Sequence, residues 1–340
     1  MMSGLLERLG VELPVVQAGM GGGIAGHELA AAVSGAGGLG TLGHAAPGLL
    51  RSELRAARER SDRPLAVNLL LPFARGGHWE AAEHADVVVT FWGRPRRRTS
   101  KPWLHQCGSV GEALAARAAG ADGVIAQGVE AGGHVRGVLA APELLERVRA
   151  ALPEHYPVLA AGGIAGHDDV ERALAAGAEA AVAGTRFVLT EESGAHPGYR
   201  RRVLDAERTL LTELFGFGWP GRHRVVPNRA TERWLGGGTS VPSWLRALNR
   251  ATAPLASRVP ADVHSFPARL QRPGVPMLSP LAAHRDAPER MLDALPLYAG
   301  ESALRIHEVV PAAAATRALA KGDPRPSSQA GTRSPPIRRR

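Results

Sequence analysis

The sequence predicts an α/β protein that folds as a (β/α)8 barrel with an additional smaller segment over the barrel mouth. Three observations favour this fold. Eight short aliphatic runs recur within the first 190 of the 340 residues, and most stretches between them place Ala, Leu, Glu and Arg at helical spacing. Each run ends in glycine or in a small or polar residue. Alternating strands and helices imply parallel strands, and eight such units make a closed barrel, with a doubly wound open sheet as the alternative.

The eight predicted strands share a short, largely aliphatic composition and follow one another in this order: Pro14–Gln17, Gly38–Leu42, Leu65–Asn68, Asp86–Phe91, Trp103–Gln106, Gly123–Ala126, Pro157–Ala160 and Ala180–Ala183. In a barrel their C-terminal ends meet on one face, where catalytic loops lie. The glycines at these ends would let a flat ligand approach the backbone closely. The pattern therefore indicates a planar cofactor that carries a phosphate.

The chain beyond the eighth strand departs from this alternation. We expect residues 1–195 to form the barrel, 196–295 an inserted substrate or lid segment, 296–320 a return to the barrel, and 321–340 a disordered basic tail. The inserted segment contains Trp219, Trp234 and Trp244, which are expected to be packing residues.

The net charge of +9 by itself suggests a polyanion partner, but the position of the charged residues in the chain changes this interpretation. The segments Lys321–Arg340 and Arg94–Lys101 each carry +5, so the other 312 residues sum to −1. Aromatic residues are only 4% of the chain, which is sparse for stacking on bases. We interpret both basic segments as solvated, and do not expect a nucleic-acid partner.

The overall composition is that of a globular protein, with 44% hydrophobic and 21% charged residues. The single cysteine, Cys107, excludes an internal disulfide and fits a reducing compartment, where we expect a buried, inert thiol. The N-terminus lacks the apolar core of a signal peptide, and no later run is long enough to span a membrane. The expected location is the cytoplasm.

A glycine-rich run at Gly21–Gly26 satisfies the GxGxxG pattern of dinucleotide-binding Rossmann units. Such units need an acidic residue about 20 positions further on to bind the ribose. The second strand instead ends in Thr41–His44, which contains no acid. We therefore interpret the run as a flexible turn.

Two later glycine-containing motifs together form a more specific pair. Ala160–Ile164 reads AAGGI after the seventh strand, and Ala183–Phe187 reads AGTRF after the eighth. Barrels that bind phosphate commonly use the loops at these two strands, where backbone amides receive the dianion. Thr185 could add a hydroxyl donor. The alternative is that the glycines only form tight turns.

His134 is the candidate base. It follows the sixth strand in QGVEAGGHVRG, Gln127–Gly137, and the flanking glycines predict a mobile, uncluttered loop at the catalytic face. Imidazole transfers protons readily near neutral pH. Most of the other histidines are expected to be solvated. The chain contains neither GxSxG nor HExxH, and nothing in it resembles a metal site.

Taken together, these motifs resemble the nitronate monooxygenase family, formerly called 2-nitropropane dioxygenases. The resemblance runs from about residue 10 to 195 and resumes at PLYAGE. The motifs that carry it are QAGM with AGGLG, NL at Asn68, QGVEAGGH at Gln127–His134, AAGGI, GTRF and TEES.

This resemblance implies an FMN-dependent enzyme. By position, the backbone at Ala18, Gly19 and Met20, the side-chain amides of Asn68 and Gln127, and Gly132 would contact the flavin ring and ribityl chain. Gly162, Gly163, Gly184 and Thr185 would hold the phosphate, and His134 would be the catalytic base. The family oxidises alkyl nitronates, or nitroalkanes after loss of the α-proton, with O2 to a carbonyl compound and nitrite.

The sequence departs from the family at two places. Family members commonly have Pro where Gly19 stands, and Arg directly after the histidine, whereas Val135 here separates His134 from Arg136. Two alternatives to the monooxygenase stay open. One is an FMN- and NAD(P)H-dependent enoyl-acyl-carrier-protein reductase, although Ala131 stands where that group commonly has serine. The other is a non-catalytic flavin-binding module with a basic tail.

Overall fold

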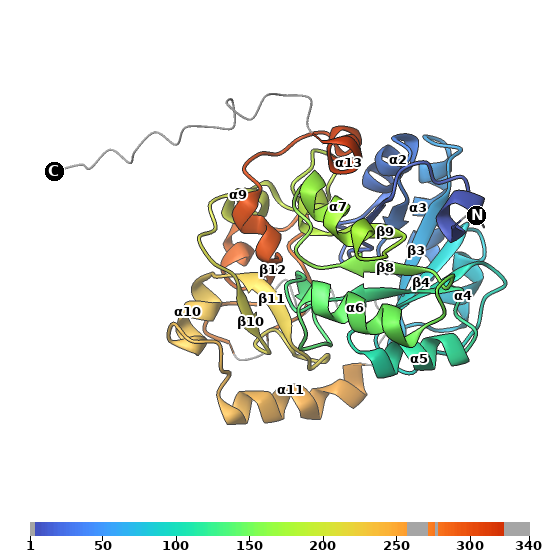
Figure 1. Cartoon of the computed structure of the whole chain (residues 1–340). Helices are drawn as coiled ribbons and strands as arrows, with labels where there is room; N and C mark the ends of the chain where they lie inside the picture. The colour runs from blue at the N-terminus through green and yellow to red at the C-terminus, as the bar shows by residue number, and fades with distance from the viewer. Residues whose placement is uncertain (1–3, 257–270, 276–277, 323–340) are drawn as a thin grey trace.

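Eight parallel strands form the centre of the molecule (Figure 1). The computed structural model describes residues 4–256, 271–275 and 278–322. Within them the strand order is β1-β9-β8-β6-β5-β4-β3-β2, and a parallel bridge between Val16 and Leu39 joins the two ends of the sheet. The strands are β1 Val15–Gln17, β2 Gly40–Leu42, β3 Leu65–Leu70, β4 Val87–Phe91, β5 Trp103–Cys107, β6 Gly123–Gln127, β8 Val158–Ala161 and β9 Ala180–Ala183. The predicted barrel is confirmed, with strand ends shifted by one or two residues.

The strands are buried on both faces because their apolar residues alternate between two cores. Along β3, Ala66 points into the barrel interior, whereas Leu65 and Val67 pack outward against the helices. The interior core is filled mostly by aliphatic side chains such as Val89 and Leu159. This double burial explains why the strands read as continuous apolar runs in the sequence.

Helices surround the barrel, and most of them cover its outside. They are α1 Leu5–Arg8, α2 His27–Gly35, α3 Pro47–Arg58, α4 Gly76–Ala82, α5 Val110–Ala118, α6 Ala141–Ala151, α7 His167–Ala175, α8 Thr185–Val188 and, from the end of the described chain, α13 Ala312–Lys321. The connection from β4 to β5 differs from the expected alternation because residues 92–102, which include the basic segment Arg94–Lys101, form no helix. In this segment Arg97 pairs with Asp122 at 3.0 Å.

A small antiparallel sheet lies at one side of the barrel mouth. It joins β10 Leu210–Thr212, β11 His223–Val226 and β12 Leu297–Tyr298, and β11 also pairs with β7 Gly133–His134. Around it lie α9 Pro197–Leu204, α10 Arg229–Leu235, α11 Ser243–Ala256 and the 3-10 turns η1 Glu289–Asp293 and η2 Glu301–Arg305. The chain beyond the eighth strand thus meets the loop that carries His134.

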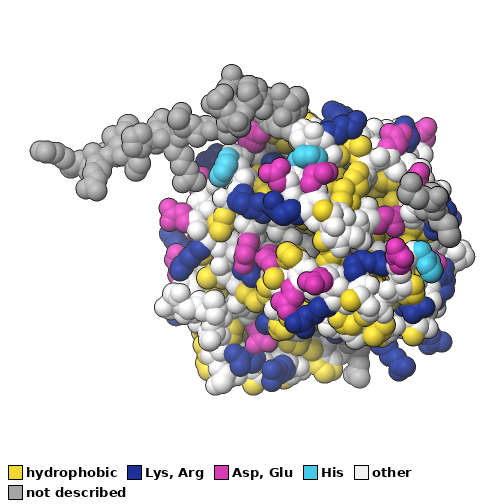
Figure 2. All heavy atoms as spheres, viewed as in Figure 1, with side chains coloured by type: hydrophobic (Ala, Val, Ile, Leu, Met, Phe, Trp, Pro, Cys, Tyr) yellow, Lys and Arg dark blue, Asp and Glu magenta, His cyan; other side chains and the backbone are white. Residues whose placement is uncertain are grey.

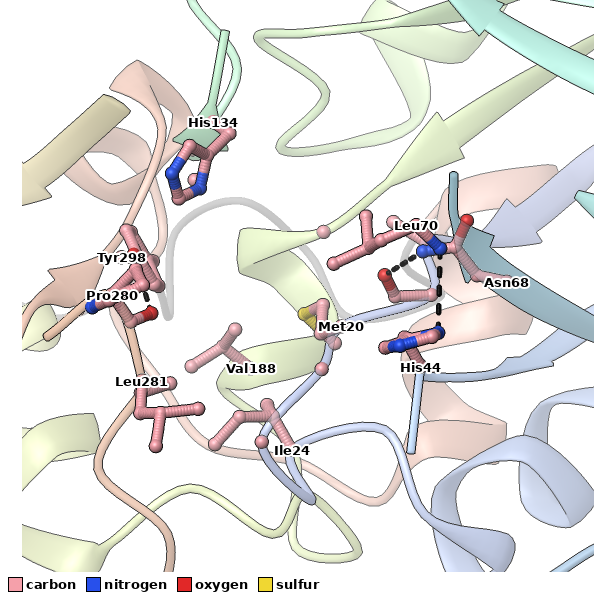
Figure 3. A pocket seen from close by; sticks show the side chains of 18 of the residues that line it. Met20, Ile24, His44, Asn68, Leu70, His134, Val188, Pro280, Leu281 and Tyr298 are labelled. Atoms are coloured by element: carbon pink, nitrogen blue, oxygen red, sulfur yellow. Dashed lines mark hydrogen bonds between the residues drawn. The ribbon is translucent and has the colours of Figure 1, made fainter. Parts of the chain in front are cut away.

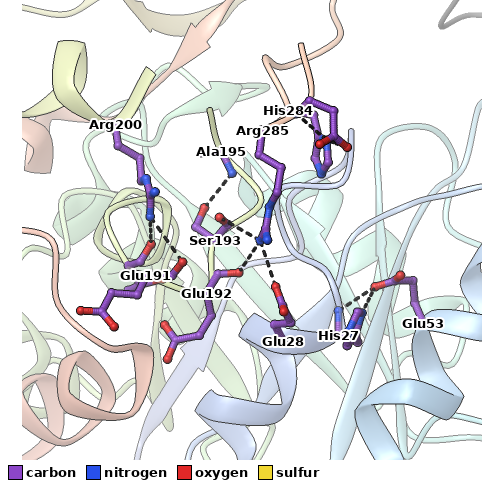
Figure 4. Close-up of polar contacts among 12 residues, drawn as sticks. His27, Glu28, Glu53, Glu191, Glu192, Ser193, Ala195, Arg200, His284 and Arg285 are labelled. Carbon is purple, nitrogen blue, oxygen red and sulfur yellow. Dashed lines mark hydrogen bonds and ion pairs between the residues drawn. The ribbon is translucent and has the colours of Figure 1, made fainter. Parts of the chain in front are cut away.

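Polar contacts tie the residues before β12 to the barrel (Figure 4). The Arg285 guanidinium lies 3.0 Å from the Glu28 carboxylate of α2 and donates to the carbonyls of Glu192 and Ser193 at 3.4 and 3.3 Å. The Arg285 amide donates to the Gly194 carbonyl at 2.7 Å. Side-chain and backbone contacts of Arg285 therefore fix this segment against α2 and the chain at residues 192–194.

The surface in Figure 2 intersperses acidic and basic side chains rather than gathering one sign into a patch. The predicted basic tail lies almost entirely outside the described residues, which end at residue 322. Across the described chain, no helix combines the length and the apolar character that crossing a membrane would require.

Candidate active site at the barrel mouth

A cavity of about 1670 Å³ opens at the C-terminal ends of the strands (Figure 3). Every residue singled out from the sequence as a site candidate lines it, and these come from five strand ends and the β6–α6 connection. They are Ala18, Gly19, Met20, Asn68, Gln127, Gly132, His134, Gly162, Gly163, Gly184 and Thr185. The structure therefore brings the whole predicted set together in one place.

Two side-chain amides, one on β3 and one on β6, use only their N–H groups in hydrogen bonds within the protein. Asn68 donates through Nδ2 to the Gly19 carbonyl at 3.0 Å, and Gln127 donates through Nε2 to the His134 carbonyl at 3.1 Å. Asn68 Oδ1 and Gln127 Oε1 are buried and have no hydrogen-bond partner. Burying a hydrogen-bond acceptor without a partner costs free energy, so these two oxygens are suited to accept hydrogen bonds from a ligand.

Gly19 is required by packing. A Cβ built there would stand 2.3 Å from the Cβ of Asn68. A proline, which stands here in many family members, would meet the same obstacle. The departure from the family pattern thus fits this chain's own Asn68 conformation. Gly132 is similarly enclosed, since its Cβ would lie 2.5 Å from the Gly300 amide nitrogen.

The glycine loops after β8 and β9 form an open backbone cradle. Gly163 has φ +74°, and a Cβ built on it would touch nothing nearer than the Glu130 Cβ at 3.9 Å. The Thr185 hydroxyl accepts from the Gly300 amide at 2.9 Å, which leaves its own proton free to be donated. The open space at Gly163 and the hydroxyl donor of Thr185 therefore lie at the two loops where the sequence predicted phosphate binding.

Asp169, a residue that the sequence did not single out, braces the β8 loop. Its Oδ2 accepts from the amides of Ala165 and Gly166 at 2.7 and 3.1 Å, and both carboxylate oxygens accept from Arg305 Nη1 at 2.9 and 3.0 Å. Burial alone would raise the pKa of Asp169, but these hydrogen bonds lower it. A fixed carboxylate at the start of α7 thereby holds the cradle in shape.

His134 is buried and held on a strand, so the prediction of a mobile, uncluttered loop is wrong. The side chain is 7% exposed, and β7 pairs with β11 through His134 and His223. The cause is that pairing, because a second segment supplies a strand edge to an otherwise glycine-rich loop. His134 Nε2 is buried without a partner in the cavity wall.

Aromatic rings fix the orientation of the His134 imidazole. Trp219 stacks on it with 3.6 Å between centroids and 10° between planes, and Trp92 meets it edge-on at 5.7 Å. Burial, followed by the neighbouring His223, lowers the pKa of His134 well below its usual value, while a hydrogen bond with the Trp219 backbone acts in the opposite direction. The imidazole is therefore neutral at neutral pH.

Several residues of this wall escaped the sequence analysis. Trp219 was expected to be a packing residue, yet it lines the cavity and its buried indole Nε1 has no partner. Most of the other histidines were expected to be solvated, but His44, His78, His105 and His223 lie in the wall or the core, each with a pKa lowered mainly by burial. Although His44 follows the second strand and His105 lies within the fifth, no spacing in the sequence shows that these side chains are buried.

Arg136 does not face the cavity. Its guanidinium Nε lies 2.6 Å from the Glu112 carboxylate and its Cζ lies 4.9 Å from the Trp92 ring centroid. The side chain of Arg136 thus points toward α5 and the Trp92 ring. Cys107 is buried, and burial raises the pKa of its thiol to about 12, as expected for an inert cysteine. Among the described residues no group of three His, Cys, Asp or Glu side chains could hold a metal ion.

The sequence is similar to a known protein family and to several named proteins. The family model described as nitronate monooxygenase matches residues 3–105 and 97–236. A Mycobacterium tuberculosis protein named (3aS,4S,5R,7aS)-5-hydroxy-7a-methyl-1-oxo-octahydro-1H-indene-4-carboxyl-CoA dehydrogenase is 34% identical, over 73% of this chain and 72% of its own. A nitronate monooxygenase of Paraburkholderia phytofirmans is 32% identical, over 61% and 72%.

Solved structures give the same similarity across nearly the whole chain. FabK from Thermotoga maritima has a TM-score of 0.73 at 26% identity and covers 94% of both chains. A nitroalkane oxidase from Streptomyces ansochromogenes has a TM-score of 0.70 at 30% identity, covering 93% of this chain and 96% of its own.

Proposed function

The chain belongs to the nitronate monooxygenase family, and on that premise we propose that it is an FMN-dependent enzyme that oxidises alkyl nitronates, or nitroalkanes after loss of the α-proton, with O2 to a carbonyl compound and nitrite. The observation that carries the proposal is the position of His134. Its neutral imidazole has a buried, unpartnered Nε2 in the same cavity as the glycine cradle.

The residues at the site fit FMN. Asn68 Oδ1 and Gln127 Oε1 are unpartnered acceptors suited to the donors of a flavin ring and a ribityl chain. The Gly162–Gly163 turn and Gly184–Thr185 offer backbone and hydroxyl donors for a phosphate. Bound FMN would supply the electron acceptor for substrate oxidation and the centre that reacts with O2.

The protein's part in the reaction is to move one proton. Because His134 is neutral, its Nε2 can accept the α-proton of a nitroalkane while the electron pair of the C–H bond passes to the nitro group. The stacked Trp219 ring supports the imidazolium that forms, since an aromatic face attracts a cation. The unpartnered Trp219 indole N–H is suited to donate to a nitro oxygen as negative charge develops there.

Comparison of a nitroalkane with its preformed nitronate tests the role of His134. In the FMN-loaded H134N variant, nitrite release from 2-nitropropane should fall at least about 100-fold, within the range of lost general-base catalysis. Oxidation of propyl-2-nitronate, which has already lost the proton, should persist, and the flavin spectrum should be unchanged. Unaltered 2-nitropropane turnover would remove His134 from the mechanism.

A second candidate function is oxidation or reduction of an acyl thioester. The observation that favours it is that the 34% identical relative is named as a carboxyl-CoA dehydrogenase. This candidate includes the NAD(P)H-dependent enoyl reductase considered above. It predicts rapid NADPH oxidation with an enoyl thioester and no nitrite from nitronates, whereas the monooxygenase predicts the reverse.

A further inference from the structure

Trp92, which directly follows β4, has a backbone conformation that tryptophan rarely adopts. Its φ is +65°, and it is the one non-glycine residue with a positive φ among those that the structure describes. A bulky side chain is disfavoured in this left-handed region, and such strain persists only where the surrounding structure holds the residue in place. Phe91, the residue before it, lines the cavity. The chain therefore places a strained residue beside the candidate active site.

The Trp92 ring lies beside the stacked rings of His134 and Trp219. Its centroid is 5.7 Å from that of His134 and 5.4 Å from that of Trp219, and the interplanar angles are 87° and 83°. The centroids of the two stacked rings are only 3.6 Å apart. A ring almost equidistant from both centroids cannot lie above or below the stack. Trp92 therefore meets both stacked rings from the side.

Backbone packing limits the movement of the Trp92 ring. A Cβ built on Gly221 would stand 2.6 Å from Trp92 Cη2 and 3.6 Å from His134 Cδ2, so the chain just before β11 lies against both rings. The Gly221 carbonyl is itself held by His223, whose Nδ1 lies 3.0 Å from it. Any side chain at this position would displace the Trp92 ring, which explains why glycine stands there.

Arg136 holds the Trp92 ring through an anchored guanidinium. Its Cζ lies 4.9 Å from the ring centroid, within the range of a cation–π contact. The Glu112 carboxylate of α5 accepts from Arg136 Nε at 2.6 Å and, through its other oxygen, from the Gly108 amide at 2.8 Å. The side chains of Arg136 and Glu112 are only 29% and 26% exposed. A partly buried ion pair therefore fixes the guanidinium against Trp92.

We propose that Trp92, held by Arg136, is a positioning residue that keeps the His134 imidazole flat against Trp219 with its Nε2 in the cavity. Trp92 is not among the residues that line the cavity, so it acts through His134 rather than on a substrate. His134 Nε2 has no hydrogen-bond partner that could fix it. Contacts between rings must therefore orient this atom, and a base works only in a well-defined geometry.

Nuclear magnetic resonance tests this role without turnover. Because the His134 ring stacks on an indole at 3.6 Å, its Hε1 and Hδ2 signals should be displaced upfield in protein with isotope-labelled histidine and added FMN. Their absence from the H134N spectrum identifies them. W92L keeps apolar bulk without an aromatic ring, so these signals should move back downfield or broaden. W92F should restore most of the upfield displacement. Unchanged His134 signals in W92L would overturn the proposal.

A matched tryptophan separates positioning from general destabilisation. Trp79 of α4 is buried in the core outside the barrel and is not among the residues that line the cavity. W79L should lower the melting temperature at least as much as W92L does and leave the His134 signals unchanged. If W79L moves these signals as far as W92L does, the proposal fails.

R136M provides the test should W92L not fold. This variant leaves the Trp92 ring in place and removes the guanidinium that lies over it. The His134 signals should move in the direction expected for W92L, but less far. Wild-type His134 signals in R136M would then overturn the proposal.

Turnover gives a second readout, which rests on the proposed function. In FMN-loaded W92L, kcat for 2-nitropropane should fall about 10- to 100-fold, because a displacement of about 1 Å can have an effect of that size. The KM and the Kd for FMN should change little, and propyl-2-nitronate should be affected less. A raised KM with unchanged kcat would contradict a positioning role. If the wild type oxidises neither compound, the proposed function fails, whereas the His134 signals still test the role of Trp92.

Discussion

Trp219 illustrates how much a single residue adds to the site. Its ring stacks on His134, and its buried indole N–H has no partner. In the FMN-loaded W219F variant the stacking is kept and the donor is lost, so kcat/KM for 2-nitropropane should fall by about 10- to 100-fold, somewhat less than for loss of a well-placed oxyanion donor. Propyl-2-nitronate should be affected less, because its charge is already present.

A matched tryptophan controls this experiment. The Trp234 indole donates to the Pro273 carbonyl at 2.7 Å, and Trp234 is not among the residues that line the cavity. W234F should therefore leave the nitrite-release rates unchanged. Equal rates in W219F and the wild type would exclude the indole N–H from the reaction.

At the residue scale the sequence predicted His134 because an imidazole in a glycine-rich connection after a strand is unusual enough to notice. It could not predict Trp219, which lies in a segment with no strand pattern, or the stacking of His44 on His78. Those contacts depend on how distant segments fold over the mouth, and no local spacing encodes them.

At the scale of elements, the β8–α7 loop depends on one carboxylate. D169N keeps the size of the Asp169 side chain but removes the charge that binds Arg305 and the loop amides. Because Asp169 is buried while Arg305 is half exposed, the loss of unfolding free energy should be modest, about 1–3 kcal/mol. The Kd for FMN, measured by flavin fluorescence, should rise.

Asp168, next to Asp169 in the chain, provides a control for the D169N variant. Asp168 is exposed in the same turn, so D168N should change neither the urea midpoint nor the Kd for FMN. An FMN affinity in D169N equal to that of the wild type would show that the brace is irrelevant to the cradle.

The eight strands of the barrel were more predictable than the strands of the small antiparallel sheet. The eight barrel strands are buried on both faces and therefore leave continuous apolar runs, which the sequence shows directly. By contrast, β7 is two residues long and exists only because β11 pairs with it. A strand of that length has no periodicity to read.

At the scale of the whole molecule, buried neutral histidines predict sensitivity to acid. Burial is the main cause that lowers the pKa of His105 and of His223 to about 4, whereas an unfolded histidine titrates near 6.5. Below about pH 6.5 the unfolded state binds protons that the folded state does not, so stability falls by about 1.4 kcal/mol per pH unit for each such histidine. This loss should continue down to about pH 4.

Urea unfolding at pH 7.5, 6.5 and 5.5 measures this effect. Whatever its stability at pH 7.5, H105Q should show a shallower decline, because one titrating group has been removed. A midpoint that stays constant from pH 7.5 to 5.5 would contradict the burial of these histidines in neutral form.

The net charge also acquires a different meaning for the whole molecule. The charge is concentrated in two segments, and the remaining 312 residues sum to −1. The face shown in Figure 2 mixes both signs, and the cavity walls are mainly glycine, aliphatic and aromatic residues. These properties suit a small, largely apolar substrate better than a polyanion.

A flavin-dependent oxidation of nitronates can be followed in the visible spectrum of the FMN-reconstituted protein under anaerobic conditions. Propyl-2-nitronate added without pyridine nucleotide should bleach the flavin band, and air should restore it with release of nitrite. A protein that fails to bind FMN, or whose flavin is bleached by NADPH but not by the nitronate, would not be a flavin-dependent nitronate oxidase.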